Sequence, residues 1–181
     1  VAALDRAGAL LAGPPGEIRL RDLAPGDAGW VIERHALHYV HGAGFDPGFE
    51  GLVAEILGAF LRTRDPACER GWIAERDGRR LGCIFCVREA EEMAKLRLFL
   101  VLPEARGTGL GRRLLAACLG FARAAGYRRM RLWTHESHRE ACALYAAHGF
   151  AILSSVPVRN YGQDLVEQVW EKDLALPDQP L

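Results

Sequence analysis

The sequence lacks the long apolar runs of membrane proteins and carries no excess of charge of one sign. Its apolar runs stay below the roughly 18 residues that a membrane-spanning helix needs. Lysine and arginine together number 23, and aspartate and glutamate also number 23. A neutral chain has no general attraction for the phosphates of nucleic acid. We therefore expect neither a membrane nor a nucleic-acid partner for this chain.

The five cysteines are an odd number and show no disulfide rhythm. Only Cys83 and Cys86 form a C-x-x-C pair, and they fall in a segment, 80–87, that is predicted to be a strand. Alternate faces of a strand would point the two thiols in opposite directions. Three histidines recur at every third residue without a matching carboxylate, which fits a polar helix face better than a metal site: His35, His38 and His41. We expect no bound metal, and free thiols in a reducing cytoplasm.

Composition along the chain predicts one domain with short flanking segments. Residues 1–16 are rich in Ala, Leu and Gly, end in Gly-Pro-Pro-Gly, and lack the basic start of a signal peptide, so we interpret them as a linker. Half of the chain is hydrophobic, which suits a single domain with a sizeable core over residues 17–176, followed by a tail at 177–181. A start at Val1 is compatible with a fragment or a processed product.

Hydrophobic periodicity predicts a strand, then two helices, and then antiparallel strands. The first strand is expected at 17–23, and the helices at 27–40 and 49–61. A hairpin follows, because Asp77 and Gly78 form an Asp-Gly turn between two short apolar segments. Further strands are expected at 72–75, 80–87, 96–102, 128–134 and 165–173.

A glycine-rich segment links the expected strand 96–102 to a helix: Arg106-Gly107-Thr108-Gly109-Leu110-Gly111-Arg112. Its three glycines let main-chain N–H groups converge without Cβ atoms in the way. The helix N-terminus adds unpaired donors and the positive end of the helix dipole. The two arginines add full positive charge. The segment is therefore predicted to hold a diphosphate.

Two familiar phosphate-binding loops do not fit this segment. A dinucleotide-binding G-x-G-x-x-G that starts at Gly107 needs glycine at position 112, and so does a G-x-x-x-x-G-K-[ST] loop. Position 112 is arginine. The pattern that fits is R-x-x-G-x-G, made by Arg106, Gly109 and Gly111. In isolation this pattern also fits a glycine-rich turn that simply starts a helix.

A second pattern follows downstream. Ser137 and Glu140 are spaced as a capping box at the start of a helix. That helix ends within the run Ala143-Leu144-Tyr145-Ala146-Ala147-His148-Gly149-Phe150. This run and the R-x-x-G-x-G segment together resemble the GNAT superfamily of N-acetyltransferases. A similarity to GNAT domains that are fused to MarR-type regulators in bacteria extends over 99–107, 132–134 and 165–171.

The resemblance covers about residues 18–173 and implies an α/β fold of the α+β type. In the GNAT fold, a central mixed, mostly antiparallel sheet is splayed between two strands and flanked by helices. Acetyl-CoA would lie in the opening between strands 96–102 and 130–134, with its pantetheine arm paired to the main chain at 100–102. The residues that the resemblance assigns to acetyl-CoA are Leu100, Val101, Leu102, Arg106, Gly107, Thr108, Gly109, Leu110, Gly111, Arg112 and His138.

By the same resemblance, Tyr145 is the catalytic residue and protonates the departing CoA thiolate. Such a proton donor is useful because CoA thiolate is a poor leaving group until its charge is neutralised. The alternative is an ordinary buried aromatic side chain. The general base stays open, because 95–102 contains no carboxylate. Nearby candidates are Glu92, His135, Glu136 and His138.

Five residues are candidates for binding the acceptor, since the first two helices and the loop before the last strand wall this site in the family: Tyr39, Phe45, Phe49, Asn160 and Tyr161. For the aromatic ones, ordinary core packing is the alternative. The resemblance implies an acetyl-CoA-dependent N-acetyltransferase in which a primary amine attacks the thioester directly. A non-catalytic acyl-CoA-binding regulatory module on the same fold is the alternative, and an unrelated α/β binding domain is a third. A homodimer and a place in a MarR-type fusion are left open.

Overall fold

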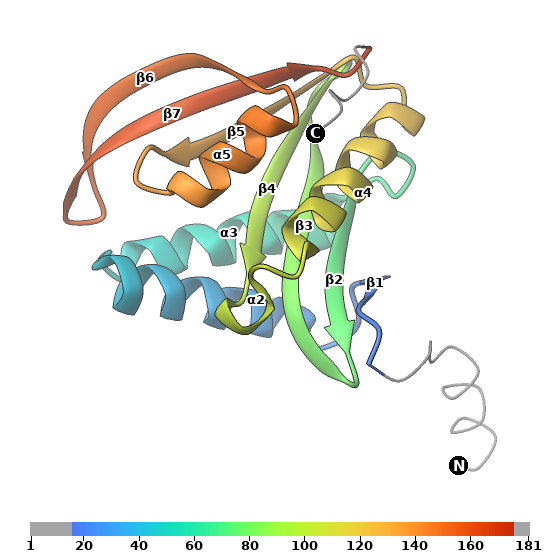
Figure 1. The fold of residues 1–181 in the computed structure, drawn as a ribbon, viewed down its shortest axis with the longest axis horizontal. Helices are drawn as coiled ribbons and strands as arrows, with labels where there is room; N and C mark the ends of the chain where they lie inside the picture. The colour runs from blue at the N-terminus through green and yellow to red at the C-terminus, as the bar shows by residue number, and fades with distance from the viewer. Residues whose placement is uncertain (1–15, 176–181) are drawn as a thin grey trace.

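A seven-stranded sheet forms the centre of the computed structural model, which describes residues 16–175 (Figure 1). The spatial order of the strands is β1-β2-β3-β4-β5-β7-β6, and every neighbouring pair is antiparallel except the parallel pair β4–β5. This confirms the expected mixed, mostly antiparallel sheet. The strands are β1 (Arg19–Asp22), β2 (Arg70–Arg76), β3 (Arg79–Ala90), β4 (Met93–Val101), β5 (Arg129–His135), β6 (Ala151–Asn160) and β7 (Gln163–Asp173). The expected linker, apart from Gly16, and the expected tail lie outside the described residues.

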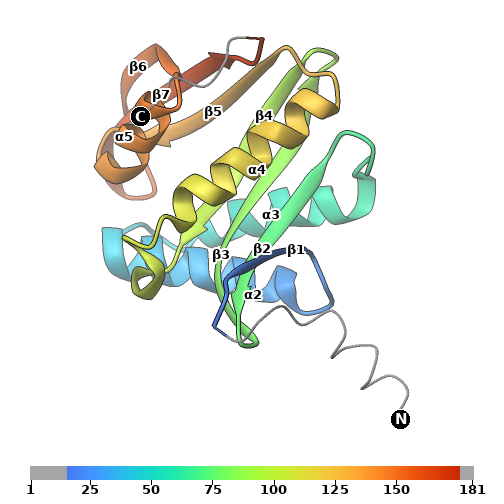
Figure 2. The same cartoon turned by 45° about the vertical axis from the view of Figure 1, so that its right-hand side comes forward.

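The helices cover both faces of the sheet. Figure 2 shows α4 (Leu110–Ala124) in front of β2, β3 and β4, with α2 (Asp27–Ala36) and α3 (Gly48–Thr63) behind them. The short helix α5 (Arg139–Ala147) lies on the same face as α4, over β5 and β7 (Figure 1). Helix α2 was expected to reach residue 40; it passes instead into a π-helical turn, Leu37–His41. Among the described helices, none is long and apolar enough to cross a membrane.

The two faces of the sheet bury separate cores. We call the cluster under α4 and α5 the α4-side core, which includes Cys86, Leu114 and Trp170. The cluster under α2 and α3 is the α3-side core, which includes Cys83 and Phe85. Cys83 and Cys86 thus lie on opposite faces, as strand alternation predicted. All five cysteines are free.

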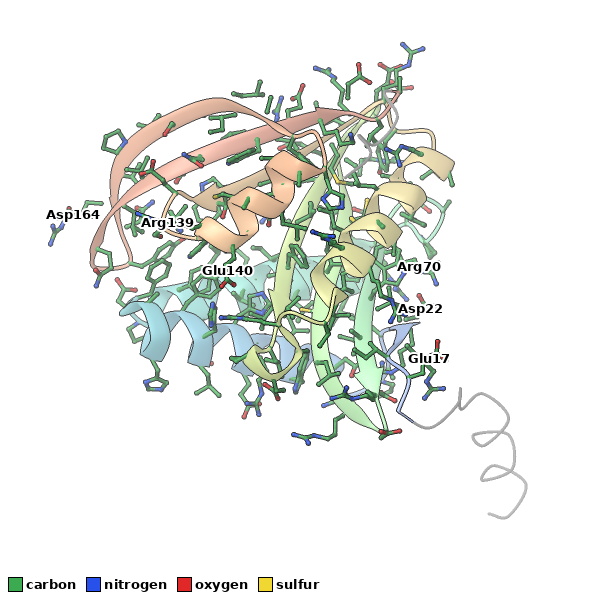
Figure 3. All side chains as sticks on the ribbon, in the orientation of Figure 1. Glu17, Asp22, Arg70, Arg139, Glu140 and Asp164 are labelled. Atoms are coloured by element: carbon green, nitrogen blue, oxygen red, sulfur yellow. The ribbon has the colours of Figure 1, made fainter. Side chains whose placement is uncertain are left out.

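Polar side chains tie the edge strand β1 to β2. Arg70 Nε lies 2.7 Å from Asp22 Oδ1, and both residues are labelled in Figure 3 together with Glu17.

The hairpin between β2 and β3 has the predicted turn, because Asp77 and Gly78 both adopt positive φ angles, 50° and 74°. Positive φ at both central positions is the requirement of a type I′ turn.

The capping box predicted at Ser137 and Glu140 is not formed. The N-cap of α5 is His138, and no side chain makes a cap hydrogen bond. The His138 N–H donates to the His135 carbonyl at 3.0 Å, which closes a turn that still contains Ser137. The helix therefore begins too late for Ser137 to be its N-cap, and Glu140 is not its third residue.

A bulge in β4 opens the sheet at its centre. Leu98 has a φ of 47°, and the register between β3 and β4 shifts at this point. The pairing of β4 with β5 ends at Leu96 and Leu132. Beyond this pair the two strands diverge, as Figure 1 shows, since a bulge bends and twists its strand. The opening that the family resemblance implied is therefore present.

Gly82 lets β3 approach this bent part of β4. A Cβ at position 82 would lie 2.6 Å from the Leu100 carbonyl oxygen and 3.3 Å from Leu114 of α4. We expect Gly82→Ala to lower the free energy of unfolding by about 1–3 kcal/mol, because the obstructing atom belongs to the backbone. Urea denaturation measures the change. Gly51→Ala in α3 is the control, because an added Cβ there meets nothing within 4 Å; equal losses in both variants would contradict the argument.

Candidate active site

A cavity of about 1360 Å³ lies where β4 and β5 diverge. The glycine-rich turn, the start of α4 and α5 line one part of it, and α3, β7 and the end of the α2 segment line the other. Figure 3 labels Arg139 and Glu140, which lie in the first turn of α5 and also line the cavity. A ligand in this cavity can therefore contact both faces of the sheet through the gap between β4 and β5.

The glycine-rich turn presents main-chain donors to the cavity. Gly107 and Gly109 have φ angles of 74° and 81°, and Gly109 is the N-cap of α4. The first main-chain bond of the helix runs from the Arg113 N–H to the Gly109 carbonyl, at 3.1 Å. The N–H groups at positions 110–112 therefore have no acceptor within the helix. Because residues 109–112 all line the cavity, these donors suit an anion.

Side-chain hydrogen bonds to main-chain carbonyls stabilise this turn. The Thr108 hydroxyl donates to the Ala105 carbonyl at 2.7 Å, and Thr108 is not among the cavity-lining residues. Arg106 Nε donates to the Val101 carbonyl at 3.4 Å, so its guanidinium lies beside the open edge of β4. Arg106 and Gly107, both expected to bind acetyl-CoA, line the cavity.

The expected pairing of a pantetheine arm with the main chain at 100–102 needs correction at Leu102, whereas Leu100 and Val101 line the cavity. The Leu102 N–H donates to the Leu81 carbonyl of β3 at 2.9 Å, and Leu102 does not line the cavity. Alternation along an antiparallel ladder then turns the main-chain groups of Leu100 toward β3 as well. Val101 and Phe99 face the opening instead. Sequence reasoning missed Phe99, because the bulge that sets this alternation has no mark in the sequence.

Tyr145 packs against three aromatic rings at the wall of the cavity. Its ring centroid lies 6.3 Å from Phe99, 5.8 Å from Phe150 and 6.2 Å from Trp170. The residue is 5% exposed and lines the cavity. Burial raises the pKa of the Tyr145 hydroxyl far above its usual value. The hydroxyl therefore stays protonated at neutral pH and can act as a proton donor.

Two histidines at the end of β5 are kept neutral. Burial, with smaller contributions from His135 and His38, lowers the pKa of His138 to about 4. Its Nδ1 atom lies 3.3 Å from the Thr134 hydroxyl, and it lines the cavity. Burial also lowers the pKa of His135, whose two ring nitrogens have no hydrogen-bond partner among residues 16–175. His135 does not line the cavity.

Of the four candidate bases, only His138 lines the cavity. Glu92 lies 3.4 Å from Arg128 in an ion pair beyond the closed end of the β4–β5 pair, and Glu136 is exposed outside the cavity. The carboxylates that do line the cavity were not predicted: Glu89, Glu140 and Glu167. Strand alternation around Trp170 could have placed Glu167 on the face opposite the α4-side core, but not beside a cavity.

The four aromatic candidates for acceptor binding form one cluster beside α3. Tyr39, Phe49, Asn160 and Tyr161 line the cavity. Phe45 does not; it is buried and stacks behind Tyr161 at 5.2 Å between ring centroids. Phe45 therefore has the position that the alternative, ordinary core packing, predicts. Tyr39 touches both Phe49 (4.4 Å) and the His138 ring (5.2 Å), so this cluster adjoins β5.

The histidines at positions 35, 38 and 41 do not gather. His35 is buried and its Nδ1–H donates to the Val31 carbonyl at 2.8 Å, whereas His41 is exposed. His38 lines the cavity. Within residues 16–175, no group of three His, Cys, Asp or Glu side chains is placed to hold a metal ion.

The chain is similar to known acetyltransferases. The model of the acetyltransferase (GNAT) family matches residues 34–150. An IAA acetyltransferase of Azospirillum brasilense is 35% identical over 103 residues, or 56% of this chain and 66% of that protein, just under two thirds of its length.

Solved structures share the fold at low sequence identity. The structure of yncA from Salmonella typhimurium, with its cofactor acetyl-CoA, is 18% identical with a TM-score of 0.69 and covers 91% of this chain and 98% of that one. An IAA acetyltransferase from Bacillus cereus is 15% identical with a TM-score of 0.63, covering 87% and 99%.

Proposed function

Because this chain belongs to the GNAT family of acetyltransferases, we propose that it moves an acetyl group from acetyl-CoA to a primary amine by direct attack. One observation carries the proposal. The unpaired N–H groups at the start of α4 and the hydroxyl-bearing ring of Tyr145 line the same cavity, together with Phe99 and Val101 of β4. A diphosphate at the first and a thioester sulfur at the second would place the coenzyme along Phe99 and Val101.

The chemistry follows from these positions. The amine lone pair attacks the carbonyl carbon of the thioester, the carbon–sulfur bond breaks, and its electron pair passes to sulfur. The Tyr145 hydroxyl gives its proton to the thiolate and regains one from solvent. The proton lost by the amine passes to water or to a basic side chain that lines the cavity. His138 and Glu167 are two such side chains. We assign no single residue to this second step.

A non-catalytic acyl-CoA-binding module is the second candidate. It is favoured by one feature, since β4 contains no carboxylate between Met93 and Val101. We also propose that the protein acts in the cytoplasm, as a homodimer, and as part of a fusion with a MarR-type regulator.

Thiol release from acetyl-CoA, measured across a panel of amines, tests the proposal. We expect release with at least one amine, and calorimetry should show CoA binding to the protein alone. CoA binding without release for any amine would support the regulatory module. Failure to bind CoA at saturating concentration would overturn both.

The turn at Gly109 offers a sharper test of where the diphosphate lies. We expect Gly109→Ala to raise the Kd for CoA by about tenfold or more, since a side chain at positive φ costs about 1–2 kcal/mol and disturbs the aligned donors. No protein atom lies within 4 Å of an added Cβ, so the side chain would also enter space that the ligand needs.

Gly120→Ala is the matched control for this measurement. Gly120 lies in the same helix with equally open surroundings and no positive φ. It should bind CoA normally and stabilise the helix by about 1 kcal/mol. Unchanged CoA affinity in Gly109→Ala would place the diphosphate elsewhere.

A further inference from the structure

The part of the cavity beside α3 has a floor formed by one face of the sheet. Arg97 of β4 is paired with Phe85, which belongs to the α3-side core, so their side chains share that face. Glu167 and Val169 of β7 alternate with Trp170 of the α4-side core, so they also face α3. Arg97, Glu167 and Val169 all line the cavity.

Arg97 differs from the other basic residues of this floor. Lys95 lies 2.8 Å from Glu89, and Arg131 lies 2.8 Å from Glu171 and 3.4 Å from Glu89. Arg97 forms no ion pair or side-chain hydrogen bond with any residue from 16 to 175, although it is partly buried. Burial lowers its pKa, and the only carboxylate that opposes this effect is Glu89, which two other cations already hold. A partly desolvated guanidinium without a partner is unfavourable unless a ligand supplies the anion.

Glu167 is the matching unpaired anion. It stands opposite His135 in the β5–β7 pair and forms no ion pair within the described part of the chain. Its charge acts on Tyr161 and His135, which are neutral at neutral pH. Within residues 16–175, the acceptor side of the cavity therefore offers a cation, Arg97, and an anion, Glu167, that form no ion pair.

The distance along β4 limits the size of the acceptor. The open main-chain edge, where the thioester is proposed to lie, begins at Phe99, two residues after Arg97. Two residues of a strand span no more than about 7 Å. Arg97 and the start of this edge are therefore close neighbours along β4, so a small acceptor can carry both an anion for Arg97 and an amine that attacks at the edge.

On these grounds we propose that the acceptor is a small amino acid, whose carboxylate binds Arg97 and whose amino group lies on the Glu167 side before it attacks. This inference rests on the proposed acetyltransferase function and specifies its substrate class. A polyamine would leave Arg97 without a partner and would place a second cation beside it. A neutral amine would leave both charges unmatched.

The test compares each of the nineteen amino acids with a primary α-amine with its carboxamide as acceptor. We expect kcat/KM for the preferred amino acid to exceed that of its carboxamide by about 10- to 100-fold, because the amide cannot accept a charged bidentate pair. Arg97→Gln should lower kcat/KM for the acid by a similar factor, mainly through KM, and leave the amide unchanged. Arg97→Lys should restore part of the loss. Lys95→Met is the control, since Lys95 lines the cavity but already has Glu89 as its partner.

Binding separates failure of this inference from failure of the proposed function. Calorimetry of the same amino acids and amides against CoA-saturated protein reports recognition even when no thiol is released. Arg97-dependent preference for the acid supports the inference in either case. Equal use of acids and amides, or equal loss for both in Arg97→Gln with unchanged CoA affinity, would overturn it while leaving the acetyltransferase proposal intact.

Discussion

Tyr145→Phe should lower kcat by about 10²- to 10³-fold and leave the affinity for CoA nearly unchanged. The phenyl ring keeps the contacts with Phe99, Phe150 and Trp170, so the packing around the residue is unchanged. What is lost is the Tyr145 hydroxyl, which burial keeps protonated at the wall of the cavity. Without it, the thiolate leaves with its full charge, and the barrier to breaking the carbon–sulfur bond rises.

Steady-state thiol release and calorimetry with CoA measure the two quantities separately. Tyr127→Phe is the matched control, because Tyr127 is also buried but lies outside the cavity, and its hydroxyl donates to the Cys68 carbonyl at 3.1 Å. That variant should lose about 1 kcal/mol of stability and keep its turnover. If Tyr145→Phe turns over like the parent, Tyr145 is a packing residue and the proton comes from elsewhere.

The folded protein should lose stability steeply as the pH falls from about 6.5 to about 4. Burial lowers the pKa of His35 and of His138 to about 4, and it lowers the pKa of His38 and His135 as well. Between pH 6.5 and 4 the unfolded chain therefore binds more protons than the folded one. The stabilisation that the neutral rings provide is complete above the unfolded value and is lost as protons are taken up below it.

The size of this effect is large compared with the stability of a typical domain. Each pKa unit corresponds to about 1.4 kcal/mol, so His35 alone accounts for about 3 kcal/mol of a total that is usually about 5–15 kcal/mol. Urea denaturation at pH 7, 5.5 and 4.5 gives the slope. His35→Leu should flatten it, whereas His41→Gln, at an exposed position, should not. A slope that His35→Leu leaves unchanged would assign the acid sensitivity to other groups.

Much of the fold could be predicted because its signals are local. The Asp77–Gly78 turn, the helix behind Gly109 and the opposite faces of Cys83 and Cys86 follow from φ preferences and strand alternation within a few residues. The capping box at Ser137 was wrong for an equally local reason. A main-chain bond from His138 to His135 competes with the side-chain cap, and the spacing of Ser137 and Glu140 does not show which one forms.

The candidate active site likewise combines residues that a local sequence segment indicates with residues that only the tertiary structure reveals. The sequence by itself determined the position of the glycine-rich turn and, through the family resemblance, proposed Tyr145 as a site residue, because each lies in a continuous segment with a recognisable spacing. Only the tertiary structure decided that Phe99 rather than Leu102 faces the opening, and that Arg97 and Glu167 lie unpaired on one floor. Those outcomes depend on a bulge at Leu98 and on the pairing of strands far apart in the chain. No short window of sequence specifies such pairings, because they arise from how whole faces of the sheet are buried.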